Sequence, residues 1–253
     1  MRYASLGSGS RGNGTLVAYD DQLVLVDCGF TVKDTLARVE RLERDPQTIT
    51  AIVVTHEHGD HIKGVGPLAR KLKCPVYMTP GTFHSRDLGK LPELNLIEGY
   101  QSFHLGALKV IPVAVPHDAR EPAQFIFEAN GLRLGILTDL GSISPHVEEA
   151  YSQCDGLVLE ANHDPHMLAS GPYPPSLKQR VGGLWGHLSN QQAAGFLQRV
   201  DIARLQQLVV AHISQKNNCL DRTRETLADV TADIDQVVYA CQDQGFDWLE
   251  LTV

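Results

Sequence analysis

The sequence crowds three histidines and two carboxylates into the stretch THEHGDH, residues 55–61. His56 and His58, one residue apart on a loop, can place two neutral imidazoles on one cation such as zinc. Asp60 and His61 then offer a carboxylate oxygen and a further imidazole nitrogen to a second cation. A solvated charged turn would have no need of imidazole. The stretch therefore predicts a site for two divalent metal ions.

Two metal ions need more ligands than this stretch supplies, and polar residues at the ends of three later apolar runs are candidates. His117 follows LKVIPVAVP, Asp139 follows LRLGILT, and His212 closes LQQLVVA. A single histidine at the end of a strand is more often a hydrogen-bonded core or surface residue than a ligand. Beside THEHGDH, however, these positions favour further ligands contributed by separate strand ends.

The elements that must position these residues alternate between strand-length apolar runs and helical periodicity. The run AIVV before THEHGDH predicts a buried strand, so the donors lie on the loop where that strand ends and a helix begins. Strands are predicted over residues 23–26, 51–55, 76–78, 107–115, 124–128, 132–137, 157–159, 208–212 and 237–239. Helices are predicted over residues 31–44, 62–72, 189–200 and 221–234, with N-caps at Ser189 and Asp221.

Asn130 and Gly131, between FIFEA and LRLGIL, predict a type I′ hairpin, so antiparallel pairing exists beside the helix-flanked strands. The sheet is therefore mixed. Meanders and hairpins in each half, with helices between them, predict an α/β (α+β) fold built as a four-layer αββα sandwich. Because the sequence has no linker, low-complexity tract or short repeat, we expect one domain over residues 1–253.

The composition is that of an ordinary globular protein, with 253 residues of which 43% are hydrophobic and 21% charged. No run approaches the roughly 20 apolar residues of a membrane-spanning helix. The five cysteines are scattered without a CxxC pair, which suits reduced thiols filling the core of a cytoplasmic protein. The formal net charge of −8 opposes a broad grip on nucleic acid, but two bound divalent cations would provide positive potential where a phosphate meets them.

Several motifs together carry a family resemblance. THEHGDH, preceded by Asp27 in LVLVDCG and followed in order by PHD, TDLG and AHIS, resembles the metallo-β-lactamase fold superfamily over most of the chain. That superfamily has the αββα architecture, and its early Asp, here Asp27, orders the metal-binding loop without ligating. The resemblance implies two sets of ligands and one bridging ligand: His56, His58 and His117 for the first metal, Asp60, His61 and His212 for the second, and Asp139 between them.

One branch of the superfamily fits further motifs. SLGSGSRGNGT, PHDAREPAQF, LEANHD, GPYPPSLKQRVGGLWGHLSN and AHISQKNN resemble the YycJ (WalJ) type of metallohydrolase, a group associated with exonuclease action on DNA. Ribonuclease Z and its phosphodiesterase relatives are also similar here, where Glu160-Ala161 and Gly186-His187 precede the last ligand. The resemblance implies a dinuclear metal hydrolase acting on phosphodiesters.

Hydrolysis of a phosphodiester needs a nucleophile, charge neutralisation on the phosphoryl oxygens and a proton for the leaving alkoxide. Metal ions held by Asp60 and the other ligands would supply the first two. His187 is a candidate general acid that Glu160 would orient and keep charged; the alternative is a polar cap on the helix that follows. His163 is a candidate contact to the substrate phosphate or metal-bound water, and the alternative is again a cap.

The glycine-rich stretch SGSRGNG offers backbone amides and the side chains of Ser8, Ser10 and Asn13 to a substrate phosphate. A hairpin loop would look the same, and the Gly-Lys-Ser/Thr ending of a Walker loop is absent. Three basic residues on predicted loops either touch a polyanion or stay solvated: Lys178, Arg180 and Lys216. The remaining histidines are predicted to be structural or exposed: His84, His104, His146 and His166.

The favoured function is a dinuclear metal phosphodiesterase acting on nucleic acid, with exonuclease action on DNA in first place. The main alternative is a thioester or lactone hydrolase of the glyoxalase II or lactonase kind. The complete second set of ligands disfavours a mononuclear iron dioxygenase. A non-enzymatic scaffold is disfavoured because all the expected ligands are present. A true β-lactamase is disfavoured because the sequence shows no export signal. Imidazole and carboxylate donors place zinc first among the metals, with manganese and iron as alternatives.

Overall fold

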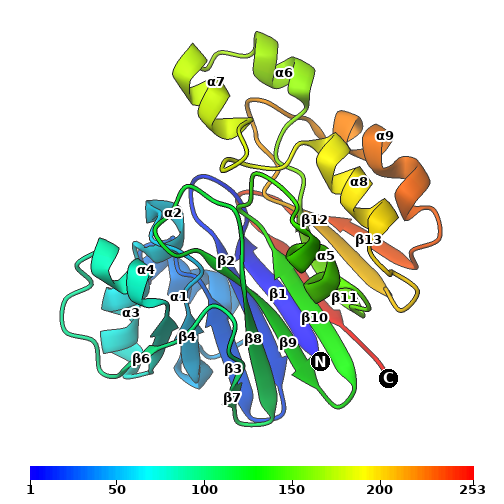
Figure 1. Cartoon of the computed structure of the whole chain (residues 1–253). Helices are drawn as coiled ribbons and strands as arrows, with labels where there is room; N and C mark the ends of the chain where they lie inside the picture. The colour runs from blue at the N-terminus through cyan, green and yellow to red at the C-terminus, as the bar shows by residue number, and fades with distance from the viewer. The chain divides into compact units, whose positions relative to one another are not determined.

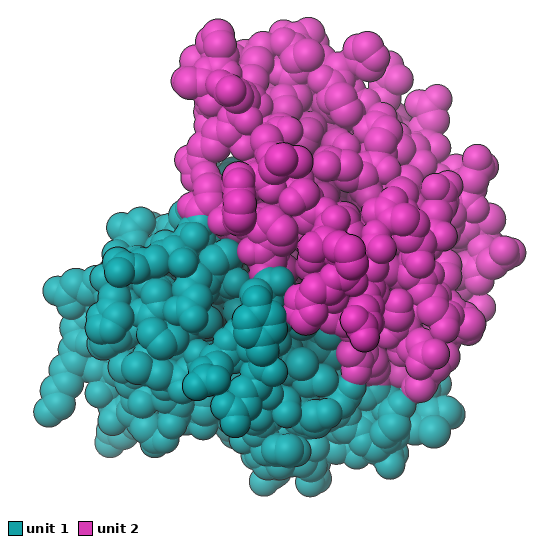
Figure 2. All heavy atoms as spheres, in the orientation of Figure 1, with its two compact units in different colours: residues 1–114, 119–132, 241–253 teal, residues 115–118, 133–240 magenta.

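The structure is a computed structural model that describes residues 1–253, and its elements are labelled in Figure 1. Contacts divide the chain into two compact units, coloured separately in Figure 2. Unit 1 comprises residues 1–114, 119–132 and 241–253, and unit 2 comprises residues 115–118 and 133–240. The expectation of a single domain stays a prediction.

Unit 1 contains the whole of one seven-stranded mixed sheet, with the strand order β14-β1-β2-β3-β4-β5-β6. The strands from β14 to β3 pair antiparallel, and those from β3 to β6 pair parallel. Their bounds are β1 Arg2–Gly7, β2 Gly14–Tyr19, β3 Gln22–Val26, β4 Ala51–Val53, β5 Val76–Met78, β6 Leu94–Leu96 and β14 Phe246–Glu250.

Helices cover this sheet through a continuous apolar core. Val39 and Leu68, on two different helices, are fully buried in one cluster with the strand residues Leu25 and Ile52. The helices of unit 1 are α1 Val32–Arg41, α2 Gly59–Ile62, α3 Val65–Leu72 and α4 Pro80–Ser85, with a 3₁₀ turn at Pro46–Thr48. The burial of β3 and β4 explains why their sequences are runs of branched apolar residues.

The second seven-stranded mixed sheet comprises β7 to β13. In unit 1 the strands β7 Phe103–Leu105, β8 Leu108–Ala114 and β9 Ala123–Ala129 form an antiparallel meander. Unit 2 holds the parallel strands in the order β13-β12-β11-β10, with the bounds β10 Leu132–Leu137, β11 Gly156–Glu160, β12 Gln207–Ala211 and β13 Gln236–Tyr239. Two mixed sheets flanked by helices confirm the predicted α/β sandwich.

The helices of unit 2 follow its strands in sequence, as parallel connections require. Tyr151 illustrates the packing, because its buried hydroxyl donates to the carbonyl of Ile136 at 2.8 Å. The helix bounds are α5 Pro145–Tyr151, α6 Pro165–Ser170, α7 Pro175–Val181, α8 Asn190–Arg199 and α9 Leu220–Thr231. None of the helices in the structure is long and apolar enough to cross a membrane.

Local sequence predictions succeed where a few neighbouring residues decide the outcome. Ser189 is the N-cap of α8 and forms a capping box with Gln192. Asn130 and Gly131 have φ values of 50° and 76°, as a type I′ turn requires. The predicted cap at Asp221 is wrong: α9 begins at Leu220, one residue earlier, after Cys219. The helix expected over residues 62–72 begins later, because α3 comprises Val65–Leu72 and Ile62 is the last residue of the separate helix α2.

All five cysteines are free, as their scattered spacing predicts. Their burial differs from the expectation of core filler. Three of them are buried, namely Cys28, Cys74 and Cys154, whereas Cys219 and Cys241 are exposed.

Candidate metal and catalytic residues

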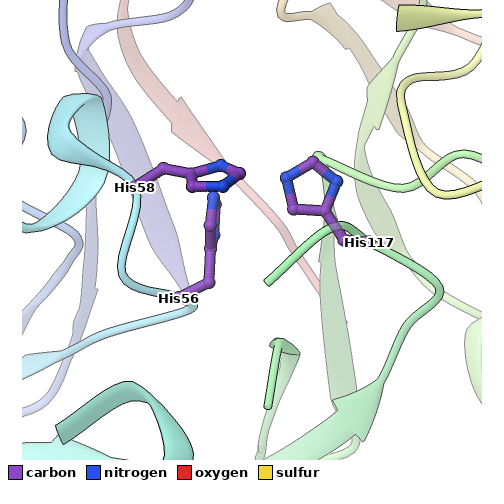
Figure 3. A group of neighbouring side chains, drawn as sticks. All are labelled: His56, His58 and His117. Carbon is purple, nitrogen blue, oxygen red and sulfur yellow. The ribbon is translucent and has the colours of Figure 1, made fainter. Parts of the chain in front are cut away.

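In unit 1 the THEHGDH loop follows the buried strand β4 and turns directly into α2. His56 and His61 are buried, and the ring centroids of these two residues lie 4.2 Å apart. His58 is half-buried, and its ring stands edge-on to that of His56 at 4.6 Å (Figure 3). The tight helical turn of α2 thus gathers imidazoles from adjacent positions of the sequence. The third side chain that Figure 3 labels, His117, belongs to unit 2.

A short hydrogen-bond chain sets the tautomers of two of these rings. The Thr55 hydroxyl donates to Asp27 Oδ2 at 2.8 Å and lies 2.9 Å from His56 Nδ1, from which it therefore accepts. His61 Nδ1 lies 2.8 Å from the same Asp27 oxygen and donates to it. Both rings then carry their proton on Nδ1 and present the Nε2 lone pair, which is the form that ligates metals.

Asp27 is held in a backbone conformation that non-glycine residues rarely adopt, with φ at 62°. Its buried carboxylate also accepts from the backbone amide of Thr55 at 2.8 Å. Strain of this kind at a residue with three hydrogen bonds into the loop is typical of functional sites. The arrangement supports a role for Asp27 in ordering the loop.

The glycine-rich stretch packs against the same loop. The backbone N–H of Asn13 donates to the carbonyl of Asp60 at 2.8 Å, and the side-chain Nδ2 of Asn13 lies 2.9 Å from His61 Nε2. Gly29 makes this approach feasible, since a Cβ there would stand 1.7 Å from the Asp60 carbonyl oxygen. Of the two serines predicted to bind phosphate, Ser8 is buried and Ser10 is exposed.

In unit 2 four side chains gather, three from the ends of separate strands and His187 from the loop before α8. The potential ligand atoms of this group lie within 4.8 Å of one another, and its members are Asp139, Glu160, His187 and His212. They meet because β10, β11 and β12 are parallel neighbours whose carboxyl ends lie at one edge, with Leu137 beside Leu159 and Glu160 beside Ala211. The sheet therefore brings together residues that lie far apart in the sequence.

Backbone strain recurs in this group. Asp139 and His212 have φ values of 54° and 55°, in the left-handed region. Each is the residue with which the chain leaves a strand and turns, so the unusual φ aims the side chain at the sheet edge instead of continuing the pleat. Asn162 supports one of them by donating from Nδ2 to the His212 carbonyl at 2.9 Å.

Glu160 is the centre of the hydrogen bonds in unit 2. Its fully buried carboxylate lies 2.9 Å from His187 Nδ1 and 2.8 Å from His212 Nδ1, and it accepts from the Leu188 amide at 2.9 Å. Burial by itself would raise the pKa of Glu160, but the charges and hydrogen bonds of the two histidines outweigh it and hold the pKa at about 2. Glu160 is therefore an ionised acceptor.

His187 combines an ionised partner with access to solvent, since its side chain is 21% exposed. Burial lowers the pKa of His187, but the charge and hydrogen bond of Glu160 more than compensate, so the pKa lies above its ordinary value. With Nδ1 bonded to Glu160, the proton that His187 can give away is on Nε2. The alternative of a helix cap is wrong, because Ser189 caps α8.

His163 stands outside this group. It is buried, and burial lowers its pKa, which favours the neutral ring. The alternative of a cap is wrong here too, since Asp164 caps α6 by accepting from Met167 N at 2.9 Å. A substrate contact for His163 stays a prediction.

The donor chemistry in both units fits divalent metal ions. Metal-binding histidines characteristically donate their second ring N–H to a carboxylate, carbonyl or hydroxyl, which fixes the ring and the tautomer. In this chain the Nδ1 partners are Thr55 for His56, Asp27 for His61, the Gly186 carbonyl at 3.0 Å for His117, and Glu160 for His212. Sequence reasoning missed Thr55 and the Gly186 carbonyl, because neither residue type marks a metal site.

The four histidines that have no role in the site are predicted to be structural or exposed, and the structure agrees. His84, His104, His146 and His166 are all exposed.

Comparison with known protein families places this chain in one of them. The sequence profile described as the β-lactamase superfamily domain matches residues 22–213, which cover most of both units. The chain therefore belongs to the β-lactamase superfamily, with the metallo-β-lactamase fold.

Within the superfamily, two bacterial relatives are similar over most of their length. Exodeoxyribonuclease YycJ of Bacillus anthracis is 34% identical over 236 residues, covering 91% of this chain and 89% of the relative. Exodeoxyribonuclease WalJ of Streptococcus pneumoniae serotype 2 is 33% identical over 241 residues, covering 93% and 90%. The crystal structure of the metallo-β-lactamase fold protein YhfI from Bacillus subtilis, 17% identical, has a TM-score of 0.73 and covers 98% of each chain, which supports the fold.

Proposed function

We propose that this chain is a metal-dependent phosphodiesterase that degrades nucleic acid, as an exonuclease acting on DNA. The observation that carries the proposal is the Glu160–His187 pair, in which a buried carboxylate lies 2.9 Å from Nδ1 of a solvent-accessible imidazole and raises the pKa of that ring. Such a pair suits a reaction whose leaving group is an alkoxide, because that oxygen needs a proton. The names of the two bacterial relatives point to the same substrate class.

We further propose that the chain binds two divalent metal ions, with zinc first and manganese or iron as alternatives. The ligands would be His56, His58, Asp60 and His61 from unit 1 and His117, Asp139 and His212 from unit 2. Bound metal ions would neutralise the phosphoryl oxygens and lower the pKa of a water to near neutrality. Metal analysis of the purified protein by mass spectrometry tests both the number and the identity.

The residues of the chain would then divide the remaining work. Asp27 and Thr55 hold the imidazoles of His56 and His61 in one tautomer, and Glu160 holds those of His187 and His212. His187 would deliver the proton from Nε2 to the departing oxygen, after which Glu160 would favour its reprotonation. Asn13 lies against Asp60 and His61 and would steady that loop or touch a phosphate oxygen.

The decisive experiment measures the metal-reconstituted protein on end-labelled single- and double-stranded DNA and RNA, with Asp60→Ala as the inactive control. We expect metal-dependent shortening of DNA from one end, absent in the variant. Absence of cleavage on all four polymers, with hydrolysis of a thioester or lactone instead, would overturn the substrate class while keeping the metal site. We also propose a cytoplasmic setting.

A further inference from the structure

One segment of unit 2 has a charge opposite to that of the whole chain. The formal net charge is −8, yet residues 165–220 contain one carboxylate, Asp201, and five cationic side chains: Lys178, Arg180, Arg199, Arg204 and Lys216. The first part of this segment, residues 165–187, includes α6, α7 and the loop after them and has no acidic residue at all. We refer to residues 165–187 as the arm. Its local charge suits a polyanion, in spite of the acidic total.

The loop at the end of the arm exposes two large apolar side chains. Leu184 is 70% exposed and Trp185 is 62% exposed. Tryptophan is enriched at binding interfaces, because its large apolar ring also carries a polar N–H. The same loop leads to the candidate general acid, because only Gly186 separates Trp185 from His187. At most roughly 7 Å of extended chain therefore joins the two Cα atoms.

The backbone beneath these side chains is held firmly. The Asp118 amide donates to the Trp185 carbonyl at 2.9 Å, and Ser142 Oγ donates to the Leu184 carbonyl at 3.0 Å. Gly186 packs so closely that a Cβ would stand 2.1 Å from the Arg180 carbonyl oxygen. The exposure of Trp185 thus belongs to an ordered loop, and the indole is presented to solvent at little entropic cost on binding.

The arm and the chain after β12 carry cationic side chains as well. Arg180, in α7, forms an ion pair with Asp118 and keeps 57% of its side chain exposed. Lys178 donates to the Ala169 carbonyl at 2.6 Å, which ties α7 to α6. Lys216 lies 5.7 Å from the centre of the Tyr173 ring and so joins the arm from the chain after β12. Aromatic and cationic side chains on one surface are the combination that binds single-stranded nucleic acid.

We propose that the arm is a binding site for single-stranded nucleic acid, in which Trp185 stacks on an unpaired base and Lys178, Arg180 and Lys216 contact backbone phosphates. This inference rests on the proposed nuclease function and deepens it. A stacked base on Trp185 would hold the adjoining phosphodiester near His187. A paired base inside a duplex has no free face to stack, so the site selects frayed or single-stranded ends.

The test measures binding of a fluorescein-labelled oligothymidylate with phosphorothioate linkages, which resist cleavage, by fluorescence anisotropy on the metal-loaded protein. Trp185→Ala should weaken binding roughly tenfold, the loss of one stacked base, while Trp185→Phe should retain most of the affinity. Tyr100→Ala is the matched control, because Tyr100 is a 75% exposed aromatic in unit 1 and its removal should change nothing. Lys178→Gln and Lys216→Gln should each flatten the salt dependence by about 0.7 in the slope of log affinity against log salt.

Hydrolysis of bis(p-nitrophenyl) phosphate separates the arm from the chemistry. That small diester carries no nucleobase or adjoining phosphates, so Trp185→Ala should cost it much less turnover than it costs oligothymidylate with ordinary phosphodiester linkages. The inference is overturned if Trp185→Ala binds oligothymidylate as tightly as the wild-type protein. It is also overturned if Trp185→Ala sediments as a monomer and the wild-type protein as a dimer, without loss of affinity, because the loop would then be a protein interface. If the wild-type protein binds and cleaves no nucleic acid, the proposed function itself fails, and the two failures are therefore distinguishable.

Discussion

In each unit a buried carboxylate accepts from imidazole nitrogens, and the two differ in whether their partners share one loop. Asp27 in unit 1 orders Thr55 and His61, which belong to one loop. Glu160 in unit 2 orders His187 and His212, which come from different loops. The same device, a buried carboxylate facing Nδ1, therefore has its partners once on a single loop and once on two separate loops.

This difference between the units predicts how sensitive the candidate site residues of each unit are to substitution elsewhere in the chain. The unit 1 donors sit on one turn, so their relative positions depend on a few backbone angles near β4. The unit 2 donors depend on the register of three parallel strands, so a shift anywhere in β10 to β12 would separate them. We expect unit 2 to be the more sensitive to substitution, and the predictions below test this, beginning with the largest effect.

Removal of Asp139 should have the largest effect. If Asp139 serves both metal ions, Asp139→Ala should lose both of them and all detectable turnover, since a bridging carboxylate neutralises two cations. Metal content per chain by mass spectrometry checks this, with Asp201→Ala, an exposed carboxylate of the same unit, as the control. Retention of two metal ions by Asp139→Ala would remove the bridging assignment.

Removal of His187 should affect chemistry and spare the metal ions. His187→Ala should slow DNA hydrolysis by roughly 10² to 10⁴-fold, the usual contribution of a general acid. The loss on bis(p-nitrophenyl) phosphate should be much smaller, because nitrophenolate leaves without a proton. His166→Ala, an exposed histidine of unit 2, is the control. Equal losses on both substrates would argue against proton donation by His187.

Neutralising the two buried carboxylates compares the units directly. Asp27→Asn should weaken metal binding by roughly 10- to 100-fold, as loss of an outer partner does. Glu160→Gln should have the greater effect on turnover, because it removes the charge that keeps the pKa of His187 raised as well as the partner of His212. Titration with a chromophoric chelator and the pH dependence of turnover measure the two effects. A larger loss of turnover in Asp27→Asn would reverse the proposed order.

The last and smallest expected effect is on thiol reactivity, which tests whether the two units unfold in one transition. Burial raises the pKa of Cys28, Cys74 and Cys154 to about 11, so at pH 8 these thiols are protonated as well as covered. Only Cys219 and Cys241 should react at once with a disulfide reagent. In increasing denaturant the three buried thiols should become reactive at one midpoint, since we predict a single domain. A separate midpoint for Cys154, in unit 2, would show two domains.

Sequence by itself determined the features whose causes lie within a few residues. The THEHGDH donors, the Ser189 capping box and the Asn130-Gly131 turn each depend on local side chains and local φ values, so their residue types announce them. The family resemblance also carried the αββα class, because its motifs span most of the chain.

Only the tertiary structure decided which distant residues meet. Glu160 accepts from His212 because the parallel strands β11 and β12 end at one edge, and the Gly186 carbonyl fixes His117 across 69 positions. The exposure of Trp185 was equally hidden, since an apolar residue in a sequence is ordinarily expected in a core. The pairing of Glu160 with His187, by contrast, was predicted with the family resemblance. Local sequence patterns determine hydrogen bonds between neighbouring residues. Residues far apart meet according to strand register and packing, which depend on the whole sheet.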